Sequence, residues 1–159
     1  MSEKHAVHHY QAVCSWRGST GAGYEAYDRS HELRAPPAPQ TLPMSSDPTF
    51  RGDPARLNPE QLLVMAAASC QMLSFLAIAA RARLDVVEYE DRAEGFMPED
   101  DKPARITRIV LKPRIVLRGA ADEARVRRLV DQAHHACYVA NSLNSTIEIT
   151  PEIVLRPRA

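Results

Sequence analysis

A single apolar stretch, residues 58–83, constrains the fold of this chain more than any other feature. It reads NPEQLLVMAAASCQMLSFLAIAARAR, and residues 62–80 carry no charged side chain. Asn58 suits a helix N-cap, and Pro59 suits the first helical position, where no N–H is needed. Glu60 adds a negative charge at the positive end of the helix dipole. The stretch therefore predicts one long helix that is apolar on nearly every face, as in buried cores and membrane spans.

The membrane alternative is the weaker of the two. About 20 apolar residues can cross a bilayer. This stretch, however, contains Ser69, Gln71 and Ser74, its commonest residue is Ala, and its flanks lack the charge bias of membrane loops. We therefore expect a buried helix in a soluble protein that has no membrane contact. A chain this short has little else to cover such a helix, so a homodimer is expected.

Composition narrows the classes of function. A chain of 159 residues fits a single domain over residues 1–159. Its 20 basic and 20 acidic residues cancel, so no net field would recruit nucleic acid or an anionic membrane. The N-terminus lacks the apolar segment of a signal peptide, and three widely spaced cysteines do not suit a disulfide framework. We expect a cytoplasmic protein, in which a cysteine pair is more often redox-active or catalytic than structural.

Hydrophobic periodicity predicts strands and a second helix around the first. The expected segments are a hairpin of strands over 9–17 and 24–33, an irregular proline-rich loop over 35–57, strands over 84–96 and 106–118, a helix from about Asp122 to a break at 141–145, and a strand over 146–155. The order ββ–α–ββ–α–β predicts an α+β fold. In the expected strand over 106–118, Pro113 predicts an edge position or a bulge. The charged residues alternate with apolar ones along this strand and are all basic, so its outer face is predicted to be basic.

Two cysteines lie on the predicted inner faces of the two helices. Cys70 is near the middle of the first, and Cys137 shares a helical face with apolar residues of the second. A buried free cysteine is commonly a small apolar core residue, and Cys14 is interpreted in that way. Cys70 is too deep in its helix for the dipole to act on it, so a reactive Cys70 would need a nearby cation held by a carboxylate. The conspicuous acid is Glu60, and the available cations are Arg17, Arg29, Arg51 and Arg56.

Other chemistries have less support in the sequence. Adjacent helical residues point about 100° apart, so His134, His135 and Cys137 do not converge easily on a metal ion, and no metal site is expected. An acyl-transfer nucleophile made of Cys70 with His31 or His135 stays open. Phosphate loops, dinucleotide fingerprints and serine elbows are missing from the sequence, so we expect no cofactor.

Two motifs carry a family resemblance. NPEQLLVMAAASC resembles the central motif of the OsmC/Ohr family, the osmotically inducible and organic hydroperoxide resistance proteins, in which Asn-Pro-Glu opens the helix and a cysteine follows ten residues after the Glu. HHACYVANSLN resembles the second cysteine motif of that family. The resemblance implies an obligate, intertwined homodimer with two long central helices per chain, wrapped by antiparallel sheets. It also implies a peroxidase that reduces organic hydroperoxides or hydrogen peroxide and is itself reduced by a cellular dithiol.

The resemblance also implies roles for particular residues. Cys70 would be the peroxidatic thiol, Cys137 the resolving thiol, and Glu60 the acid that holds an activating arginine. This chain departs from the family pattern at that arginine. Arg17 precedes the first hairpin turn, whereas family members with well-defined peroxidase activity carry the arginine inside it. Arg29 is therefore the matching residue, together with a histidine two residues on, in what resembles a divergent branch.

A second departure follows the second cysteine. Tyr138 stands where many proteins of this sort have proline. Because of the departures, two other interpretations stay open. One is a binding or stress-related protein with this fold and without efficient peroxidase activity, and the other is a cysteine-dependent hydrolase.

Overall fold

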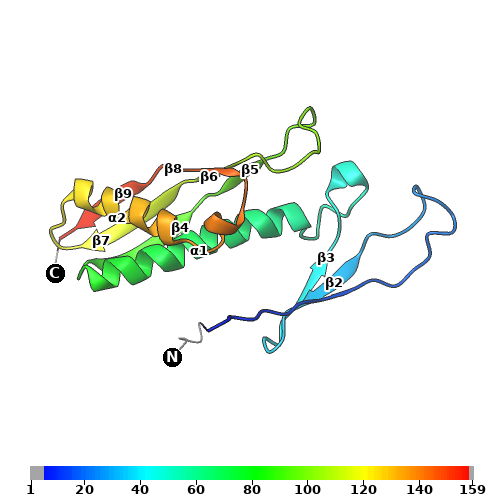
Figure 1. Ribbon diagram of the computed structural model, residues 1–159, viewed down its shortest axis with the longest axis horizontal. Coiled ribbons are helices and arrows are strands. Elements are labelled where there is room, and N and C mark those ends of the chain that lie inside the picture. Colours follow the sequence, from blue (N-terminus) through cyan, green and yellow to red (C-terminus); the bar gives the residue numbers. More distant parts are fainter. Residues whose placement is uncertain (1–5, 158–159) are drawn as a thin grey trace, which may run out of the picture. The chain divides into compact units, whose positions relative to one another are not determined.

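The chain forms two compact units in a computed structural model that describes residues 6–157 (Figure 1). The first unit is Met1–Pro59 and the second is Glu60–Ala159. The order of elements gives an α+β fold with two helices, as the sequence predicts. A single domain over residues 1–159 stays a prediction.

The first unit contains a three-stranded antiparallel sheet in the order β1-β2-β3. Its strands are β1 (Val13–Ser15), β2 (His31–Arg34) and β3 (Thr41–Met44). The predicted hairpin pairing of the first two strands is confirmed, although both strands are shorter than expected. β3 lies inside the stretch predicted to be irregular, so that part of the prediction is wrong. Its Pro43 is compatible with a strand because β3 is at the edge of the sheet, where one side needs no ladder hydrogen bonds.

Backbone hydrogen bonds order the rest of the proline-rich stretch. A short 3₁₀ helix, η1 (Pro48–Phe50), is capped by Asp47, whose side chain accepts a hydrogen bond from the Thr49 N–H at 2.8 Å. The Asp47 carbonyl also accepts a hydrogen bond from the Gly52 N–H at 3.0 Å. A Cβ atom at Gly52 would lie 1.6 Å from the carbonyl oxygen of Ser46, so only glycine fits. This segment is a defined loop that leads into the first helix.

The second unit contains two three-stranded sheets with a common register. The strands are β4 (Asp85–Asp91), β5 (Glu94–Phe96), β6 (Arg108–Leu111), β7 (Pro113–Arg118), β8 (Thr146–Ile149) and β9 (Glu152–Arg156). The sheets have the orders β4-β7-β9 and β5-β6-β8. Ile109 pairs with Ile147 and Ile115 with Ile153, so the register continues unshifted from one sheet to the other. Each predicted long strand therefore occurs as two consecutive strands in one interrupted layer.

The last strand pair corrects the expectation of purely antiparallel sheets. β8 and β9 run parallel to β6 and β7, because the intervening helix carries the chain back across the layer. Pro113 also lies elsewhere than predicted: it is the first residue of β7, which is the central strand of its sheet. A first strand position accommodates proline.

The predicted basic surface of β6 and β7 is neutralised by neighbouring acids. Each basic residue of the predicted charged face pairs with an acid on an adjacent strand: Arg108 with Glu148, Lys112 with Glu94, Arg114 with Glu88 and Glu152, and Arg118 with Asp85. These pairs are exposed, and exposed pairs contribute little stability each. Because of these ion pairs, the predicted basic face of β6 and β7 has no strong positive field.

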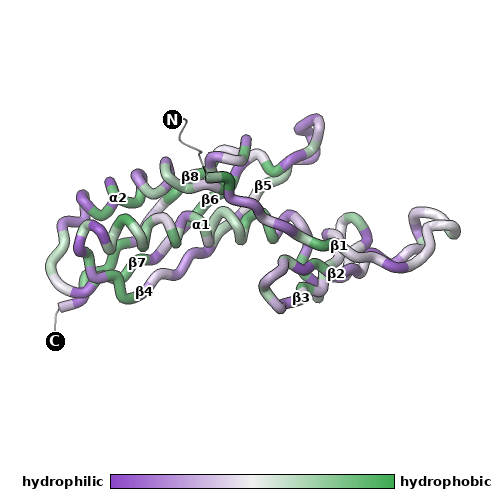
Figure 2. Tube along the Cα trace, turned by 60° about the horizontal axis from the view of Figure 1, so that its bottom comes forward, coloured by the Kyte–Doolittle hydropathy of each residue, from purple (hydrophilic) through white to green (hydrophobic). Residues whose placement is uncertain are grey.

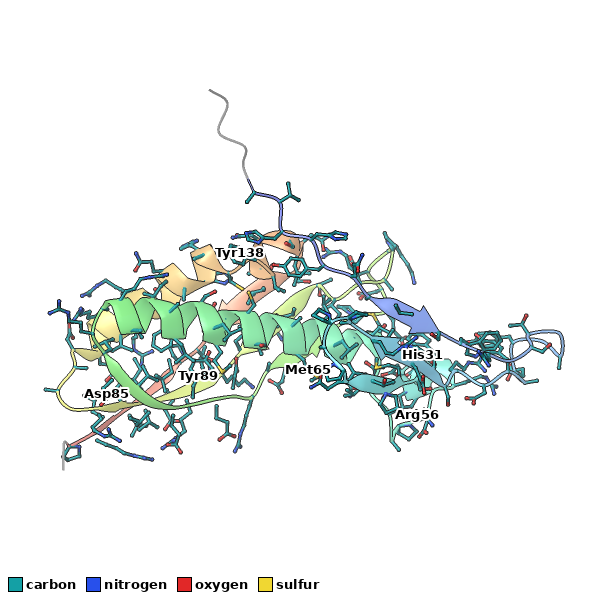
Figure 3. All side chains as sticks on the ribbon, turned by 90° about the horizontal axis from the view of Figure 1, so that it is seen from below. His31, Arg56, Met65, Asp85, Tyr89 and Tyr138 are labelled. Carbon is teal, nitrogen blue, oxygen red and sulfur yellow. The ribbon has the colours of Figure 1, made fainter. Side chains whose placement is uncertain are left out.

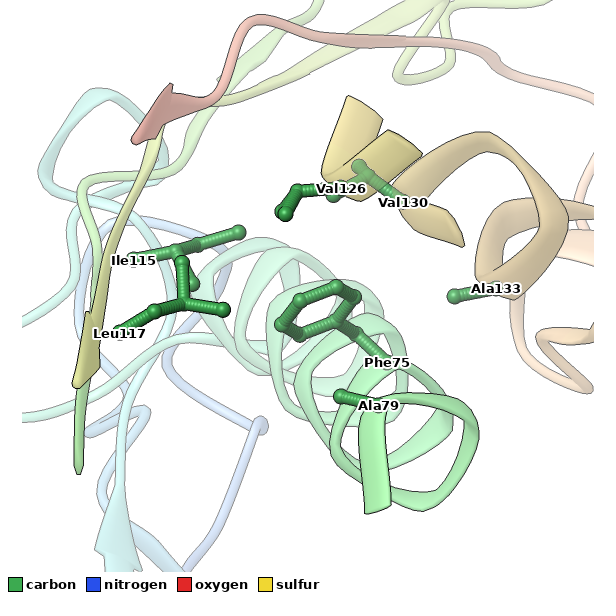
Figure 4. Close-up of a cluster of buried hydrophobic side chains, with 7 residues drawn as sticks. All are labelled: Phe75, Ala79, Ile115, Leu117, Val126, Val130 and Ala133. Atoms are coloured by element: carbon green, nitrogen blue, oxygen red, sulfur yellow. The ribbon is translucent and has the colours of Figure 1, made fainter. Parts of the chain in front are cut away.

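Both predicted helices are present and pack on the same strand. They are α1 (Pro59–Arg81) and α2 (Glu123–Ala136), and Asp122 caps α2 by accepting a hydrogen bond from the Ala124 N–H at 3.0 Å. Figure 4 shows the core that they share with β7, which consists of Phe75, Ala79, Ile115, Leu117, Val126, Val130 and Ala133. Each of these side chains is at most 1% exposed. The α2 face predicted from helical spacing is thus confirmed.

α1 buries one stripe rather than every face. Ala67, Gln71, Phe75 and Ala79 follow one another at helical spacing and are buried. By contrast, Leu73 is 61% exposed, and Met65, which Figure 3 labels, is 51% exposed. Figure 2 shows α1 as hydrophobic along most of its length. α1 is long and apolar enough to cross a bilayer, but its buried stripe packs on β7 and α2 as a core helix does. Among the described residues of one chain, Met65 and Leu73 therefore mark an exposed apolar stripe of α1.

Candidate active site

The two predicted thiols meet where α2 ends. Cys70 lies in the middle of α1 and is partly exposed. Cys137 is the C-cap of α2 and is 1% exposed, and its N–H donates a hydrogen bond to the His134 carbonyl at 3.1 Å. Both thiols are free, and they lie near enough for each to shift the pKa of the other. The structure therefore brings together the two cysteines that the sequence singles out.

A turn after α2 places backbone N–H groups near both sulfurs. The N–H groups of Tyr138 and Val139 act on the Cys70 thiol and lower its pKa. The next one, of Ala140, donates to the Cys137 sulfur at 3.4 Å. A short 3₁₀ helix, η2 (Ala140–Ser142), continues the turn. Three successive backbone N–H groups thus lie beside the thiol pair, where their dipoles favour a thiolate.

These surroundings separate the pKa values of the two thiols. Burial raises the pKa of the Cys70 thiol, but the Val139 N–H, the Cys137 thiol, the Tyr138 N–H and the Ser74 hydroxyl together outweigh it and hold the pKa below its ordinary value. Burial is also the largest influence on Cys137, and with the adjacent Cys70 it raises the pKa of that thiol. Cys70 is therefore the thiol that ionises first, and only its thiolate is nucleophilic.

These groups differ in kind from the cation that the sequence argument expects, and that cation stays a prediction. The sequence argument required a nearby cation to lower the pKa of Cys70. The groups that lower it are backbone N–H groups, a hydroxyl and the second thiol, all of them uncharged. Periodicity could not reveal them, because they belong to a turn outside helix and strand. The sequence contained one indication of these N–H groups. Residue 138 is a tyrosine, which has a backbone N–H, whereas a proline at that position would have none.

A pocket of about 320 Å³ opens beside Cys70. Its lining is mostly apolar, with Leu73, Ala77 and Ile78 from α1 and with Tyr138 from the turn. Tyr138 is 83% exposed and is labelled in Figure 3. Cys70 contributes to this lining and the buried Cys137 does not. A small apolar molecule in the pocket would therefore meet the more acidic thiol first.

Glu60 is separated from Cys70 by the helix that carries both. It lies in the first turn of α1, and α1 is one helix from Pro59 to Arg81. Ten residues of helix advance about 15 Å, which exceeds the reach of a glutamate side chain. The structure therefore does not bring Glu60 and Cys70 together along α1.

Arg29 is held inside the first unit. Its guanidinium donates to the carbonyl oxygens of Tyr27 and, at 2.5 Å, of Tyr24. The guanidinium carbon also lies 3.8 Å from the centroid of the Tyr27 ring and 4.7 Å from that of Tyr24. The residue is only 9% exposed, whereas Arg17 is exposed. The predicted pairing of Arg29 with Glu60 stays a prediction.

The histidines do not join the thiol pair in the second unit. None of the groups that shift the pKa of Cys70 is a histidine. Burial, together with the neighbouring His135, lowers the pKa of His134. Among residues 6–157, no group of three His, Cys, Asp or Glu side chains is placed to hold a metal ion.

Fold and site together define an α+β protein in which two helices, packed on one sheet face, present a pair of unequal thiols. The chain belongs to the OsmC-like protein family, whose sequence model matches residues 52–152. A curated relative is the uncharacterized protein YmaD of Bacillus subtilis, which is 24% identical over 98 residues. That match covers 60% of this chain and 65% of the relative, so it spans less than two thirds of the relative's length.

Solved structures share the fold. An OsmC-like protein of unknown function from Vibrio cholerae has a TM-score of 0.83 and 26% identity, over 91% of this chain and 99% of that one. An organic hydroperoxide resistance protein from Elizabethkingia anophelis has a TM-score of 0.70 and 14% identity, over 96% and 99%. The organic hydroperoxide resistance protein OsmC from Legionella pneumophila has a TM-score of 0.68 and 16% identity, over 94% and 98%. At these identities the last two share the fold alone.

Proposed function

We propose that this protein is a thiol-dependent peroxidase that reduces organic hydroperoxides or hydrogen peroxide. The observation that carries the proposal is the inequality of the two contacting thiols. Cys70 lines an apolar pocket and has a lowered pKa, whereas Cys137 is buried and has a raised pKa. An attacking thiol must reach the substrate as thiolate, and a resolving thiol must wait beside it.

The reaction proceeds in two balanced steps. The Cys70 thiolate attacks the peroxide oxygen and the O–O bond breaks, so that after protonation the products are a Cys70 sulfenic acid and an alcohol, or water from hydrogen peroxide. The Cys137 thiol then forms an S–S bond with the Cys70 sulfur and water leaves. A cellular dithiol reduces this disulfide by exchange and becomes a disulfide itself, which restores both thiols.

The names of two structural relatives support the peroxidase proposal. The proteins from Legionella pneumophila and Elizabethkingia anophelis are named organic hydroperoxide resistance proteins. Of the other functions considered, a cysteine hydrolase needs a histidine beside the nucleophile, and none is among the groups acting on Cys70. A binding or stress-related protein that has lost efficient peroxidase chemistry is the main alternative, because it too could retain a thiol pair.

We further propose that the working form is a cytoplasmic homodimer. The uncovered apolar stripe of α1, which includes Met65 and Leu73, suits a second copy of the same helix. In such a dimer, Glu60 of one chain could serve the Cys70 of the other, with Arg29 as the cation that Glu60 anchors. The arginine would add to the stabilisation that the backbone N–H groups already supply. Leu73→Glu should then shift the protein toward monomer in sedimentation, while the exposed Arg92→Glu should not.

The decisive experiment is the mass of the intact, reduced protein after one equivalent of cumene hydroperoxide. A peroxidase loses two hydrogen atoms as the Cys70–Cys137 disulfide forms, and peptide mapping assigns the bridge to those two residues. The Cys137→Ser variant, treated in the same way, should gain one oxygen at Cys70. Unchanged thiols after the addition would exclude the peroxidase and favour the binding protein.

A further inference from the structure

A buried amide interrupts the apolar stripe of α1. Gln71 directly follows Cys70 in the sequence, is 1% exposed, and lies between Ala67 and Phe75 on the buried stripe. Adjacent helical residues point about 100° apart, so this amide is directed into the core while the Cys70 thiol borders the pocket. Removing an amide from water costs free energy unless its donor and its acceptor are both hydrogen-bonded. Its hydrogen bonds therefore decide what the amide contributes.

The donor end of the amide joins the two helices. The Gln71 Nε2 group donates a hydrogen bond to the Val130 carbonyl oxygen of α2 at 3.1 Å. This carbonyl lies in the middle of α2, where the N–H of His134 is its partner in a regular α-helix. A carbonyl oxygen has two lone pairs, so it can accept from both groups. The hydrogen bond thus ties α2 to α1 at the residue next to Cys70.

The acceptor end of the amide is not paired within the protein. No protein group among residues 6–157 donates a hydrogen bond to the buried Gln71 Oε1 atom. An unpaired buried acceptor costs at least as much free energy as one neutral hydrogen bond contributes. An apolar side chain of similar volume, such as methionine, avoids this cost. Stability alone therefore does not account for an amide at this position.

The position of Val130 decides where Cys137 lies. Val130, Ala133 and Cys137 follow one another at helical spacing, and the first two belong to the core that α2 shares with α1 (Figure 4). Apolar contacts are not directional, so they tolerate small shifts and rotations of one helix on the other. A hydrogen bond is directional and holds one register. Because Cys137 lies only about 10 Å further along the helix, a fixed Val130 gives it a fixed place.

The chemistry of the thiol pair depends on that place. A disulfide requires Cα atoms within about 7 Å of each other and side chains that point together. A shift of α2 by one turn, about 5.4 Å, would take Cys137 away from Cys70. A contact that fixes the register of α2 therefore controls whether the two sulfurs can bond.

We propose that Gln71 is a positioning residue, which holds Cys137 within reach of Cys70 by fixing the register of α2 on α1. The step that it serves is the formation of the S–S bond between Cys137 and the Cys70 sulfenic acid, so in this respect the inference rests on the proposed peroxidase function. The same register also favours the disulfide over the two thiols in exchange with a dithiol, and that equilibrium involves no peroxide.

The test compares Gln71→Met with the original chain in that equilibrium. Methionine has a similar volume and no donor, so the contact with Val130 is lost while the core stays filled. Both chains carry Cys14→Ser and are equilibrated with mixtures of reduced and oxidised dithiothreitol. Intact mass then gives the fraction with the Cys70–Cys137 disulfide. The equilibrium constant for this disulfide should fall about fivefold, the order expected for one neutral hydrogen bond.

A matched control separates register from general loosening of the core. Phe75→Leu, one turn further along the same stripe, leaves a cavity and lowers the free energy of unfolding, but it removes no hydrogen bond to α2. It should leave the disulfide equilibrium constant unchanged. An unchanged constant in Gln71→Met, or an equal fall in Phe75→Leu, would overturn the proposal, because a merely structural role predicts one of these two results.

A single turnover with one equivalent of cumene hydroperoxide tests the same role in the reaction. Gln71→Met should form the Cys70 sulfenic acid as fast as the original chain, form the disulfide about fivefold more slowly, and accumulate more over-oxidised acid. Equal slowing of both steps would contradict a role in positioning Cys137. If the original chain does not react with the peroxide, the proposed function fails, whereas the equilibrium with dithiothreitol still decides the role of Gln71.

Discussion

The two units each contain a thiol-lined pocket, and the two pockets favour negative charge by different means. Around Cys70, the backbone N–H groups of Tyr138 and Val139 lower the pKa of one thiol. In the first unit, the buried guanidinium of Arg29 is one of the groups that line the pocket beside Cys14. N–H dipoles act over a short range and in one direction, so they select a particular atom. A cation acts over a longer range and accepts any anion that fits. The first arrangement suits chemistry at a fixed sulfur, and the second suits ligand binding.

The largest expected effect comes from removing the sulfur to which the N–H groups point. Cys70→Ser should abolish peroxide consumption, because the serine hydroxyl is not ionised at neutral pH and does not attack the peroxide. Cys137→Ser should still react once and then stall as a sulfenic or over-oxidised acid, since only the attacking thiol is needed for the first step. Rapid-quench mass spectrometry measures both. A Cys70→Ser protein that reacts as fast as the original chain would refute the assignment.

The pH dependence should distinguish the two thiols of that site. The lowered pKa of Cys70 means that its thiolate persists to lower pH than that of a free cysteine, and that the first step slows only as pH falls through this lowered value, by about tenfold for each further unit. The raised pKa of Cys137 should make disulfide formation continue to accelerate at higher pH. Once Cys70 is oxidised, its negative charge no longer raises the pKa of Cys137, but the burial of Cys137 still raises it. A single pKa that governs both steps would contradict this separation.

A smaller effect should follow from deleting one N–H donor. Tyr138→Pro removes a backbone N–H that lowers the pKa of Cys70, so the pKa of that thiol should rise. Its reaction at neutral pH should slow by about tenfold, the order expected for one hydrogen bond to a charged group. Tyr138→Ala keeps the N–H and is the matched control for the titration. Thiolate absorbance against pH measures both variants. Equal titration curves for the proline and alanine variants would show that this N–H does not set the pKa.

The sequence predicted the features that depend on periodicity and missed those that depend on turns. The uncharged run over residues 62–80 located α1, and Val126, Val130 and Ala133 at helical spacing located the buried face of α2. Once two helices pack through those faces, their cysteines meet. The N–H groups that lower the pKa of Cys70 could not be predicted, because their direction depends on how the chain leaves the C-cap at Cys137.

The errors in the strands have a similar origin. Alternation of apolar residues does not show where a strand is interrupted, so β6 and β7 were expected as one strand and the central position of Pro113 was missed. β3 was missed because three of its four residues, TLPM, are exposed and alternation is absent. The acids that neutralise the basic face lie on other strands, so only the pairing of strands could reveal them.

The smallest expected effect, a factor of about two, concerns how Glu60 contributes to the Cys70 site. α1 continues unbroken between the two residues, and the ten residues advance about 15 Å. Even with an arginine side chain placed between them, Glu60 therefore cannot act on the Cys70 of the same straight helix. We therefore predict that Glu60 acts on the Cys70 of the second chain in a homodimer, with one composite site for each chain.

A mixed dimer distinguishes the two geometries. One chain carries Glu60→Ala and its partner carries Cys70→Ser. If Glu60 acts across the dimer, one site has both substitutions and the other has neither, so about half of the original turnover survives. If Glu60 acts within its own chain, each site has one substitution and almost no turnover remains. The matched control is a dimer with both substitutions in one chain, for which the expected results are reversed: almost none across the dimer and about half within one chain. Equal activity of the two dimers would mean that Glu60 does not belong to the site at all.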